Sequence, residues 1–334
     1  MLGVAVVVYL AALLGAAGAV HALGDRWWIA TALLFAPRWV LGLPLLVLVP
    51  VALTTRRRLL APLGAALILL LGPVMGFRVA WPGVLLHRDD PPDLRVMTFN
   101  IGGNIGGNIG GGPSISPTAL AAMLSEIRPD VAAFQECDID LDRLRSAGWF
   151  AHSNSNLCVV SRFPIRRATS DPGKLGPGHA SGKVFAYVLE TEAGPLTLLN
   201  LHLATVRPGL FEIMHRGWRG APDLTANSAL RRLESRVARD RATRMAPLPI
   251  VVGDFNVPVE SAIYREAWSA WSNAFSRAGL GFGWTKYTRW HGVRVDHVLY
   301  GPDWECRRAW VGPSLAFDHR PVVADLVRTR AGAR

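Results

Sequence analysis

The sequence contains few cysteines, and this scarcity limits the kinds of fold that it encodes. Only Cys137, Cys158 and Cys306 are present, which is too few for a small fold held together by several disulfides. Cys137 follows one strand-like run, and Cys158 lies in the next, Leu157–Val160. If these strands are neighbours and the domain is exported, the two cysteines can form a disulfide; otherwise both are free thiols. Cys306 is expected to be a buried thiol.

Charged residues are almost absent from three long stretches near the N-terminus. Met1–Gly24 and Leu59–Phe77 contain no Lys, Arg, Asp or Glu, and Trp27–Leu53 contains only Arg38. About 20 apolar residues are needed to cross a bilayer, so the first and third stretches are predicted to be transmembrane helices. The second is also long enough, but Pro37 and Arg38 interrupt it. Because a charge in mid-membrane is costly, we expect Arg38 to face other helices, or the segment to be kinked or re-entrant.

The first stretch has a second interpretation, as a cleavable signal peptide. Ala17-Gly18-Ala19 is typical of a cleavage site, but no basic residues precede the apolar run and two more runs follow. The pattern therefore favours an anchor over residues 1–80 with two to three transmembrane helices. A proline-containing linker is predicted over residues 81–92, and a large domain over residues 93–328.

The basic residues near these stretches predict an orientation. Arg56, Arg57 and Arg58 form the only basic cluster among them, and such clusters remain in the cytoplasm. The third stretch would then run from inside to outside. The sequence therefore predicts an integral membrane protein whose large domain lies on the extracytoplasmic side, whether or not the second stretch spans.

The net charge of +11 is spread over both parts of the chain. Residues 1–92 contribute +4 and the remainder contributes +7. A domain with this charge attracts polyanions, which include nucleic acids and anionic lipid headgroups. Charge by itself does not choose between these partners.

Past the linker, strand-like and helix-like segments alternate, which predicts an α/β fold. A helix is expected over residues 117–128, with Ser116 as its cap and apolar residues on one face. A longer helix is expected over residues 225–244, with an inner stripe of Leu230, Leu233 and Val237. The apolar runs that predict strands are Leu94–Phe99, Val131–Phe134, Leu196–Leu201, Pro249–Val252, Val295–Tyr300 and Val322–Leu326.

Short polar motifs accompany these six apolar runs. Polar residues at the ends of buried strands tend to project into a cleft, and six such ends are hard to explain as ordinary turns. The motifs are Thr98-Phe99-Asn100, Phe134-Gln135-Glu136, Asn200-Leu201-His202, Gly253-Asp254-Phe255-Asn256, Arg294-Val295-Asp296-His297 and Phe317-Asp318-His319-Arg320-Pro321.

In their order and residue types, these motifs resemble those of the endonuclease/exonuclease/phosphatase superfamily, which includes nucleases, sphingomyelinases and inositol polyphosphate phosphatases. The resemblance extends over roughly residues 93–327, and Gly-Asp-Phe-Asn followed by Asp-His-Arg-Pro-Val is its most specific part. It implies a four-layer α-β-β-α sandwich like that of deoxyribonuclease I. It also implies a phosphoester hydrolase that uses Mg²⁺ or Mn²⁺, because a divalent cation offsets the negative charge of the phosphoester and of its leaving oxygen.

The resemblance assigns three residues to the metal. Glu136 would bind the ion directly, Asn100 would supply an amide oxygen to the same ion or its waters, and Asp318 would lie beside it. Without the resemblance, Glu136 is simply a solvated carboxylate at a strand end.

The resemblance also assigns the catalytic residues. Asp254 would orient and deprotonate the attacking water, and Asn256 would bind a phosphate oxygen. His319 would contact the phosphate, with its ring held by Asp296. His202 would act as the acid for the leaving oxygen, unless it is only a packed strand histidine. The carboxylate that would pair with His202 is expected after Cys158, and residues 159–164 do not contain one.

His297 should point to the opposite face of its strand, away from the site. Two loops are candidates for substrate binding through Arg216, Trp218 and Trp284, since these side chains suit stacking on bases or entry into a lipid interface. Ordinary exposed loops are the alternative. The Gly-Asn repeat over residues 101–112 either overhangs the cleft as a lid or is a tolerated expansion in a surface loop.

Three functions follow from these patterns. The first is a membrane-anchored phosphodiesterase or phosphatase that acts on a lipid headgroup or small phosphoester. The second is a membrane-anchored nuclease that degrades DNA or RNA. The third, a catalytically inactive binding module, is disfavoured because all the matched acidic and imidazole positions are present. No obligate protein partner is predicted; the expected partners are the phosphoester substrate and the lipid bilayer.

Overall fold

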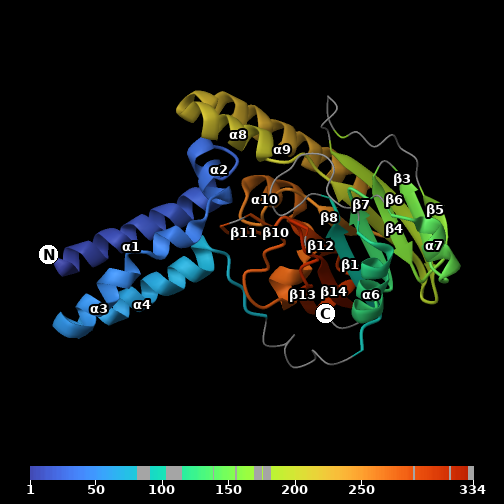
Figure 1. The fold of residues 1–334 in the computed structure, drawn as a ribbon, viewed down its shortest axis with the longest axis horizontal. Helices are drawn as coiled ribbons and strands as arrows, with labels where there is room; N and C mark the ends of the chain where they lie inside the picture. Colours follow the sequence, from blue (N-terminus) through green and yellow to red (C-terminus); the bar gives the residue numbers. More distant parts are fainter. Residues whose placement is uncertain are drawn as a thin grey trace.

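A computed structural model gives the fold of the chain (Figure 1). Most of the Gly-Asn repeat (residues 103–114) and most of the predicted linker (residues 81–90) lie outside the residues that it describes. The described residues are 1–80, 91–102, 115–137, 139–154, 156–168, 175, 182–288, 290–315 and 317–329.

Two six-stranded mixed sheets form the centre of the large domain. In the first sheet the order is β13-β14-β1-β2-β4-β3, and in the second it is β5-β6-β7-β8-β12-β9. The strands of the first sheet are β1 (Leu94–Asn100), β2 (Val131–Gln135), β3 (Phe150–Asn154), β4 (Leu157–Ser161), β13 (Trp304–Val311) and β14 (Val322–Arg328). Those of the second are β5 (Ile165–Ala168), β6 (Lys183–Thr191), β7 (Gly194–His202), β8 (Ile250–Asp254), β9 (Ser272–Asn273) and β12 (Asp296–Tyr300). A separate two-stranded ribbon contains β10 (Lys286–Tyr287) and β11 (Gly292–Val293).

The sheets pack face to face, and helices cover their outer faces. A core cluster that includes Val96, Val252 and Tyr187 fills the space between the sheets. The domain helices are α6 (Pro117–Ile127), α7 (Leu141–Ser146), α8 (Arg207–Arg216), η5 (Gly217–Gly220), α9 (Ala221–Thr243), α10 (Ala262–Trp268) and α11 (Ala274–Ala278). Residues of α6 and α7 share a cluster with the first sheet, and those of α9 and α10 share one with the second. This arrangement confirms the predicted four-layer sandwich.

The predicted helix over residues 117–128 forms as α6. Ser116 accepts a hydrogen bond from the Ala119 amide, Pro117 stands in the first turn, and Leu120, Met123, Leu124 and Ile127 are buried. The Cys137–Cys158 disulfide is also present, with 5.9 Å between the Cα atoms. Antiparallel pairing of β2 with β4 and a hydrogen bond from the Cys137 amide to the Asn156 carbonyl at 3.0 Å hold the two cysteines close together. Cys306 is a buried thiol, as predicted.

The inner stripe predicted for the long helix α9 is wrong in part: Val237 packs against the core beside the second sheet, but Leu233 does not. Leu233 is 46% exposed, whereas Arg231 and Glu234 are completely buried. Glu234 accepts hydrogen bonds from the amides of Gly182 and Ala204, both at 2.7 Å. Because these two charged side chains have partners elsewhere in the chain, the helix buries a polar face that periodicity assigns to solvent.

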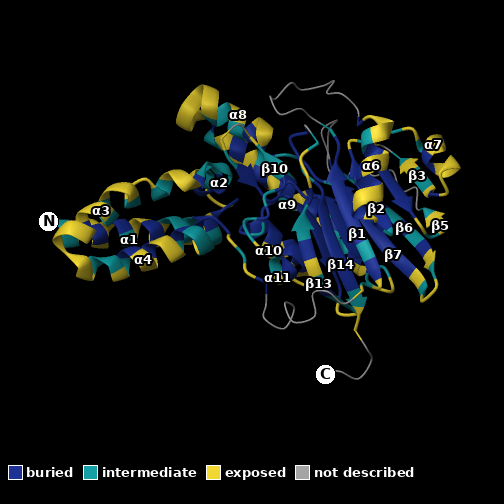
Figure 2. Ribbon diagram, turned by 60° about the horizontal axis from the view of Figure 1, so that its bottom comes forward, coloured by how far each residue is buried: buried dark blue, intermediate teal, exposed yellow. Residues whose placement is uncertain are grey.

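The N-terminal residues form a bundle that projects from the domain (Figure 1). Its elements are α1 (Leu2–Gly18), η1 (Ala19–Leu23), α2 (Trp28–Phe35), η2 (Arg38–Gly42), α3 (Leu45–Thr55), η3 (Arg57–Leu59), α4 (Leu60–Leu69) and η4 (Leu70–Val74). Three continuous helical segments are long and apolar enough to span a membrane: Leu2–Leu23, Arg38–Thr55 and Arg57–Val74. Figure 2 shows their outer surfaces exposed along most of the bundle.

The second apolar stretch is broken at Pro37, as one of its alternatives predicted. Its first part, α2, lies against the domain, and Arg38 begins the candidate spanning segment instead of standing in its middle. Arg38 is buried and donates to the Val74 carbonyl at 2.7 Å. The turn between α3 and α4, which contains Arg57 and Arg58, lies at the end of the bundle remote from the domain (Figure 1).

The bundle is joined to the domain through buried charges. Arg231 of α9 donates to Asp25 at 2.7 Å, and both side chains are 0% exposed. Ser261 also donates to Asp25. Nearby, Glu260 is buried; burial raises its pKa, but Arg38, Arg294 and other arginines outweigh burial and hold that pKa below its ordinary value. The domain is therefore held on the N-terminal bundle by specific contacts rather than only by the connecting segment.

Candidate active site

The polar motifs converge at one end of the two sheets. Parallel pairing aligns Asn100 of β1 with Gln135 of β2, and His202 of β7 with Asp254 of β8. Antiparallel pairing brings Asp296 of β12 opposite Asp254. The register aligns the site residues within each sheet. Face-to-face packing of the two sheets then brings Asn100 next to Asp254, which is 154 residues away in the chain.

A buried hydrogen-bond network beneath the site joins the two sheets. Gln135 donates to the Asn200 side chain at 2.7 Å and to Thr98 at 3.1 Å. Asn200 donates to the carbonyls of Phe134 and Cys158, both at 3.1 Å. These motif residues are fully buried, so their amides support the site from below and do not face the cleft.

Asn100 connects two carboxylates. Its Nδ2 lies 3.1 Å from Glu136 Oε1 and 3.0 Å from Asp254 Oδ2, and its Oδ1 accepts from the Gly102 amide at 2.9 Å. The amide therefore holds Glu136 and Asp254 close to each other although like charges repel. This geometry places Asn100 and Glu136, two of the predicted metal ligands, together, but the Nδ2 of Asn100, and not the predicted amide oxygen, faces the two carboxylates.

The backbone at Glu136 is held in an unusual conformation. Its φ of 50° is in the left-handed region, which bulky residues rarely adopt. Gly102 makes room for the resulting position, because a Cβ at that residue would overlap the Glu136 carboxylate. Strained backbone of this kind is concentrated at functional sites, where surrounding structure enforces it.

Asp254 occupies the centre of the site. Its side chain is 1% exposed, and its Oδ1 accepts from the Asn256 amide at 2.9 Å. Asn256 also has a positive φ of 50°, and its Nδ2 donates to the Leu203 carbonyl at 2.8 Å. Gly253 is required before Asp254, since its φ is 141° and a Cβ there would collide with the Leu201 backbone.

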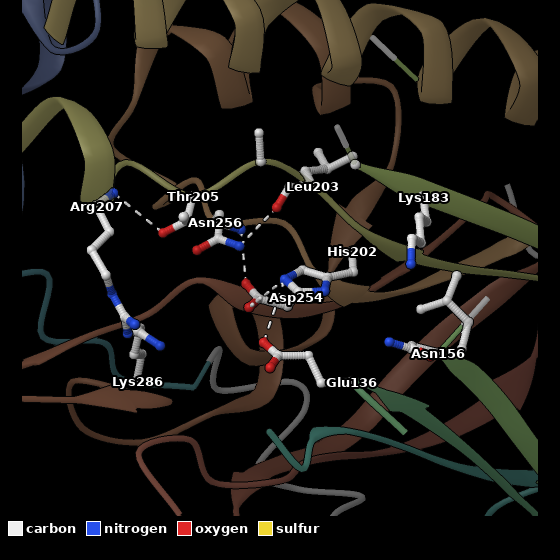
Figure 3. A pocket seen from close by; sticks show the side chains of 13 residues that line it. Glu136, Asn156, Lys183, His202, Leu203, Thr205, Arg207, Asp254, Asn256 and Lys286 are labelled. Atoms are coloured by element: carbon white, nitrogen blue, oxygen red, sulfur yellow. Dashed lines mark hydrogen bonds and ion pairs between the residues drawn. The ribbon is translucent and has the colours of Figure 1, made fainter. Parts of the chain in front are cut away.

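His202 lies on the open side of Asp254. Its Nε2 is 3.6 Å from Asp254 Oδ2 and 3.9 Å from Glu136 Oε1 (Figure 3). Within the described residues, these are the carboxylates that approach His202, and none comes from the segment after Cys158. The part of the chain that the structure describes therefore contains no deoxyribonuclease-like carboxylate partner for His202, in agreement with the lack of one in residues 159–164.

His319 lies on the buried side of Asp254. Its Nδ1 is 2.8 Å from Asp296 Oδ2, and its Nε2 is 3.6 Å from Asp254 Oδ2. Burial lowers the pKa of His319, but the charges of Asp296 and Asp254 outweigh burial and the nearby Lys286, so this pKa is raised overall. Lys286 Nζ lies 2.7 Å from His319 Nε2. At that distance one of the two nitrogens donates a hydrogen bond to the other.

Asp318 lies beside His319 and is bound by two cations. Lys286 Nζ is 2.9 Å and Arg207 NH2 is 3.3 Å from Asp318 Oδ2. Its other oxygen, Oδ1, is buried and makes no hydrogen bond within the described residues. The same holds for Asp296 Oδ1.

These side chains fit a hard divalent cation. Carboxylate and amide oxygens are the ligands that Mg²⁺ prefers, and among the described residues two buried carboxylate oxygens, Asp296 Oδ1 and Asp318 Oδ1, have no hydrogen-bond partner. Asp254, Asp296 and His319 also place ligand atoms within 4.8 Å of one another, which differs from the predicted set of Asn100, Glu136 and Asp318. The Asp296–His319 contact is better explained as a hydrogen bond that orients the ring, so we favour the set around Glu136 and Asn100.

A cleft of about 270 Å³ lies above these residues. Its lining includes the acidic side chains of Glu136 and Asp254, the amide of Asn256 and the imidazole of His202 (Figure 3). Positive charge is added by Lys183, Arg207 and Lys286. Sequence reasoning missed Lys183 and Lys286. The rarity of lysine could have pointed to them, because the whole chain has only three lysines and two of these line the cleft.

The three predicted substrate-binding residues from loops do not line the cleft. Arg216 is paired with Glu212 and Asp223, both at 3.1 Å, and Trp218 is 72% exposed. Trp284 stacks on Phe282 with 4.7 Å between ring centroids and packs against the anchor helices.

His297 is buried away from the site, as expected. Its Nε2 is within 2.9 Å of the Val257 carbonyl, and its Nδ1 is within 3.2 Å of Asn273. Burial lowers its pKa to about 3, so the ring is neutral.

Several solved structures share this fold. An endonuclease/exonuclease/phosphatase from Beutenbergia cavernae DSM 12333 superposes with a TM-score of 0.53 at 17% identity, covering 73% of each chain. The catalytic domain of human nocturnin with bound sulfate gives 0.51 at 17% identity, covering 72% of this chain and 96% of that one. Humanized D. rerio TDP2 superposes with a TM-score of 0.51 at 13% identity, covering 70% of this chain and 98% of that one. At such low sequence identity, these structural similarities establish only that the fold is shared. No curated protein matches the chain.

The family model agrees with the fold. The Endonuclease/Exonuclease/phosphatase family model matches residues 97–324, which is more than half of the chain and includes every motif at the strand ends. The chain therefore belongs to the Endonuclease/Exonuclease/phosphatase family.

Proposed function

We propose that this protein is a membrane-anchored, divalent-metal-dependent phosphoester hydrolase in which an activated water attacks phosphorus. Its family consists of phosphoester hydrolases. The observation that carries the proposal is the position of Asp254, a buried carboxylate that lies next to Asn100, His202 and His319 at the base of a cleft lined by cations.

Glu136, Asn100 and Asp318 would hold the metal, with Mg²⁺ or Mn²⁺ as the proposed ion. When bound, the ion offsets the negative charge on the phosphoryl group and on the leaving oxygen. The fit rests on the donor types, and on the buried Asp318 oxygen that has no hydrogen-bond partner among the described residues.

The protein's own groups supply acid–base chemistry and positioning. Asp254 would orient the attacking water and accept its proton, since it is buried and fixed by hydrogen bonds from Asn100 and the Asn256 amide. Asn256 would hold a phosphate oxygen through the second N–H of its side-chain amide. His202 is the more accessible of the two imidazoles, with 26% of its side chain exposed. It would protonate the leaving oxygen.

The cations would bind and neutralise the phosphoryl group. His319, oriented by Asp296, would stabilise charge that builds up on the phosphoryl oxygens in the transition state. Lys183 and Arg207 reach the cleft from opposite sides (Figure 3). These donors suit a compact anionic group.

The anchor supports action at a membrane. Apolar side chains point outward along all three candidate spans, such as Val4 (68% exposed), Leu46 (72%) and Ile68 (73%). In water such surfaces are unfavourable, and in a bilayer they are matched by the lipid tails. The arginine turn at the far end of the bundle would remain in the cytoplasm, which would place the catalytic domain outside.

Hydrolysis of DNA or RNA is the second candidate. It is favoured by the +7 charge outside the anchor region and by the cationic cleft rim, because phosphate backbones are bound by such surfaces. Purified full-length protein assayed with plasmid DNA, RNA, sphingomyelin and phosphoinositides would discriminate between the two.

The proposal is tested by metal removal and substitution. Phosphoester hydrolysis by the purified full chain should require Mg²⁺ or Mn²⁺ and stop in excess chelator. Glu136→Ala and Asp254→Ala should each abolish turnover while leaving the unfolding temperature close to that of the wild type. Asp142→Ala is a matched control, since that carboxylate is 89% exposed on α7, and its activity should be unchanged. Full activity in chelator, or in both site variants, would contradict the proposal.

A further inference from the structure

The hairpin formed by α8, η5 and the start of α9 exposes large apolar side chains. Phe211 is 52% exposed, Met214 is 77% exposed and Trp218 is 72% exposed. Phe211 and Met214 are three positions apart on α8, so they lie on one face of the helix, and Trp218 follows in η5. We call these three residues the α8 apolar surface.

This surface does not resemble an ordinary solvent-facing helix. A single exposed apolar residue needs no explanation, but a group of large ones indicates a binding surface. Arg219 lies beside Trp218, with its guanidinium 5.6 Å from the ring centroid. An aromatic ring next to a long cationic side chain suits the boundary between lipid tails and headgroups, where Trp rings and Arg side chains are both favoured.

The position of the hairpin identifies what it meets. In Figure 1, α8 and the start of α9 extend past α2 to the side of the domain that carries the bundle, and Figure 2 shows the same relation. Exposed tryptophans also lie where the bundle joins the domain: Trp27 (44%), Trp39 (40%) and Trp290 (68%). Trp39 donates to the Trp290 carbonyl at 3.0 Å, which ties an anchor tryptophan to a domain loop.

We infer that the α8 apolar surface is a second membrane contact, which inserts into the interfacial zone of the phospholipid bilayer next to the spanning helices. The inference rests on the proposed membrane anchoring. Together with Trp27, Trp39 and Trp290, the surface completes a band of aromatic side chains at the level where the bundle meets the domain. Such bands mark the membrane–water interface.

The contact would fix the cleft relative to the bilayer. Arg207, the first residue of α8, lines the cleft and pairs with Asp318. A helix of this length, 10 residues, extends over about 15 Å, so α8 connects the rim of the cleft directly with the bilayer surface. The spanning helices alone leave rotation of the domain about the bundle axis unopposed by lipid, whereas this second contact restrains it.

The experiment measures lipid contact at single positions of the full-length protein in phosphatidylcholine nanodiscs. Met214→Cys and Trp218→Cys would each carry an environment-sensitive fluorophore, and the discs would contain lipid with a nitroxide quencher just below the headgroup. Cys137 and Cys158 are joined and Cys306 is buried, so the introduced cysteine is the reactive one. We expect the quencher to remove most of the fluorescence at both positions.

Two further labels separate the possible outcomes. Ile68→Cys, on the outer face of α4, reports whether the bundle is in the bilayer and should be quenched. Phe150→Cys is a matched control, because Phe150 is an aromatic residue that is 44% exposed on β3, at the end of the domain away from the bundle, and it should not be quenched.

Quenching at residue 68 without quenching at 214 and 218 would overturn the second contact and leave the anchor intact; it would favour a protein partner for this surface. Absence of quenching at residue 68 would overturn the anchoring and the inference with it. Equal quenching at residues 150 and 218 would also contradict the inference, since the domain would then have no fixed orientation.

Discussion

Replacing Arg231 with alanine is expected to weaken the attachment of the catalytic domain to its anchor. Arg231 of α9 and Asp25 of the anchor form an ion pair of 2.7 Å in which both side chains are 0% exposed. Phe35 of α2 covers the guanidinium, with 5.2 Å between the guanidinium carbon and the ring centroid. Burial lowers the pKa of Arg231, and the Asp25 charge opposes that shift. Each charge is therefore tolerated in the interior mainly because the other is present.

The size of the effect follows from what remains after the substitution. Asp25 would stay buried with a hydrogen bond from Ser261 but without its neutralising charge. Removing one partner of a buried ion pair costs about 3–5 kcal/mol, because the desolvated charge that remains is uncompensated. For a domain of this size each kcal/mol corresponds to about 2–4 °C in melting temperature. The expected decrease is therefore about 6–20 °C.

Thermal unfolding of the full chain in nanodiscs, followed by tryptophan fluorescence, measures this change. Arg236→Ala is the matched control, since Arg236 is exposed on the same helix, and its melting temperature should equal that of the wild type. The double variant Asp25→Leu/Arg231→Met removes both charges and retains apolar volume, so it should recover most of the loss. If Arg231→Ala has the same melting temperature as the wild type, the buried pair does not hold the two parts together and the reasoning is refuted.

Three further predictions concern the site and the topology. Asp296→Asn should lower kcat by about two to four orders of magnitude with a smaller effect on KM, because the His319 ring loses its orienting acceptor; an unchanged kcat would remove Asp296 from the mechanism. Gly102→Ala should displace the Glu136 carboxylate and weaken activation by Mg²⁺ by about 10–100-fold, measured as activity against metal concentration, and normal activation would show that Glu136 tolerates the new methyl group. Reporter fusions after residue 92 should behave as exported and those within residues 54–58 as cytoplasmic, and neutralising Arg56–Arg58 should scramble this orientation; a cytoplasmic catalytic domain would overturn the assignment.

Local sequence was sufficient wherever a segment's structure depends on its own residues. Each apolar run forms its predicted strand to within a few residues, because a buried strand is recognisable from a short apolar segment alone. The helix after Ser116 begins and ends nearly as predicted, since its cap and its apolar face are encoded in consecutive residues. The site residues Asn100, Glu136 and Asp254 were found because they end such strands within a specific family pattern.

Local sequence was insufficient wherever a side chain is satisfied by a distant part of the chain. Leu230, Leu233 and Val237 have the spacing of a buried stripe, yet α9 turns Arg231 and Glu234 inward because their partners lie in the anchor and in the β6–β7 region. Trp284 lies in a loop that was assigned to the cleft, but it packs against the N-terminal helices. Periodicity within each segment gives no sign of this contact.

The sequence by itself therefore determined the family, the strands that carry the motifs and the chemistry offered at their ends. Only the tertiary structure decided how these parts face one another: that Lys183 and Lys286 reach the cleft, that Arg38 begins a candidate spanning segment, and that the domain is attached to the N-terminal bundle through Asp25 and Arg231. The physical reason is that a buried charge is stable only beside its partner. Such partners are set by three-dimensional packing between residues up to about 200 positions apart, which no local pattern in the chain encodes.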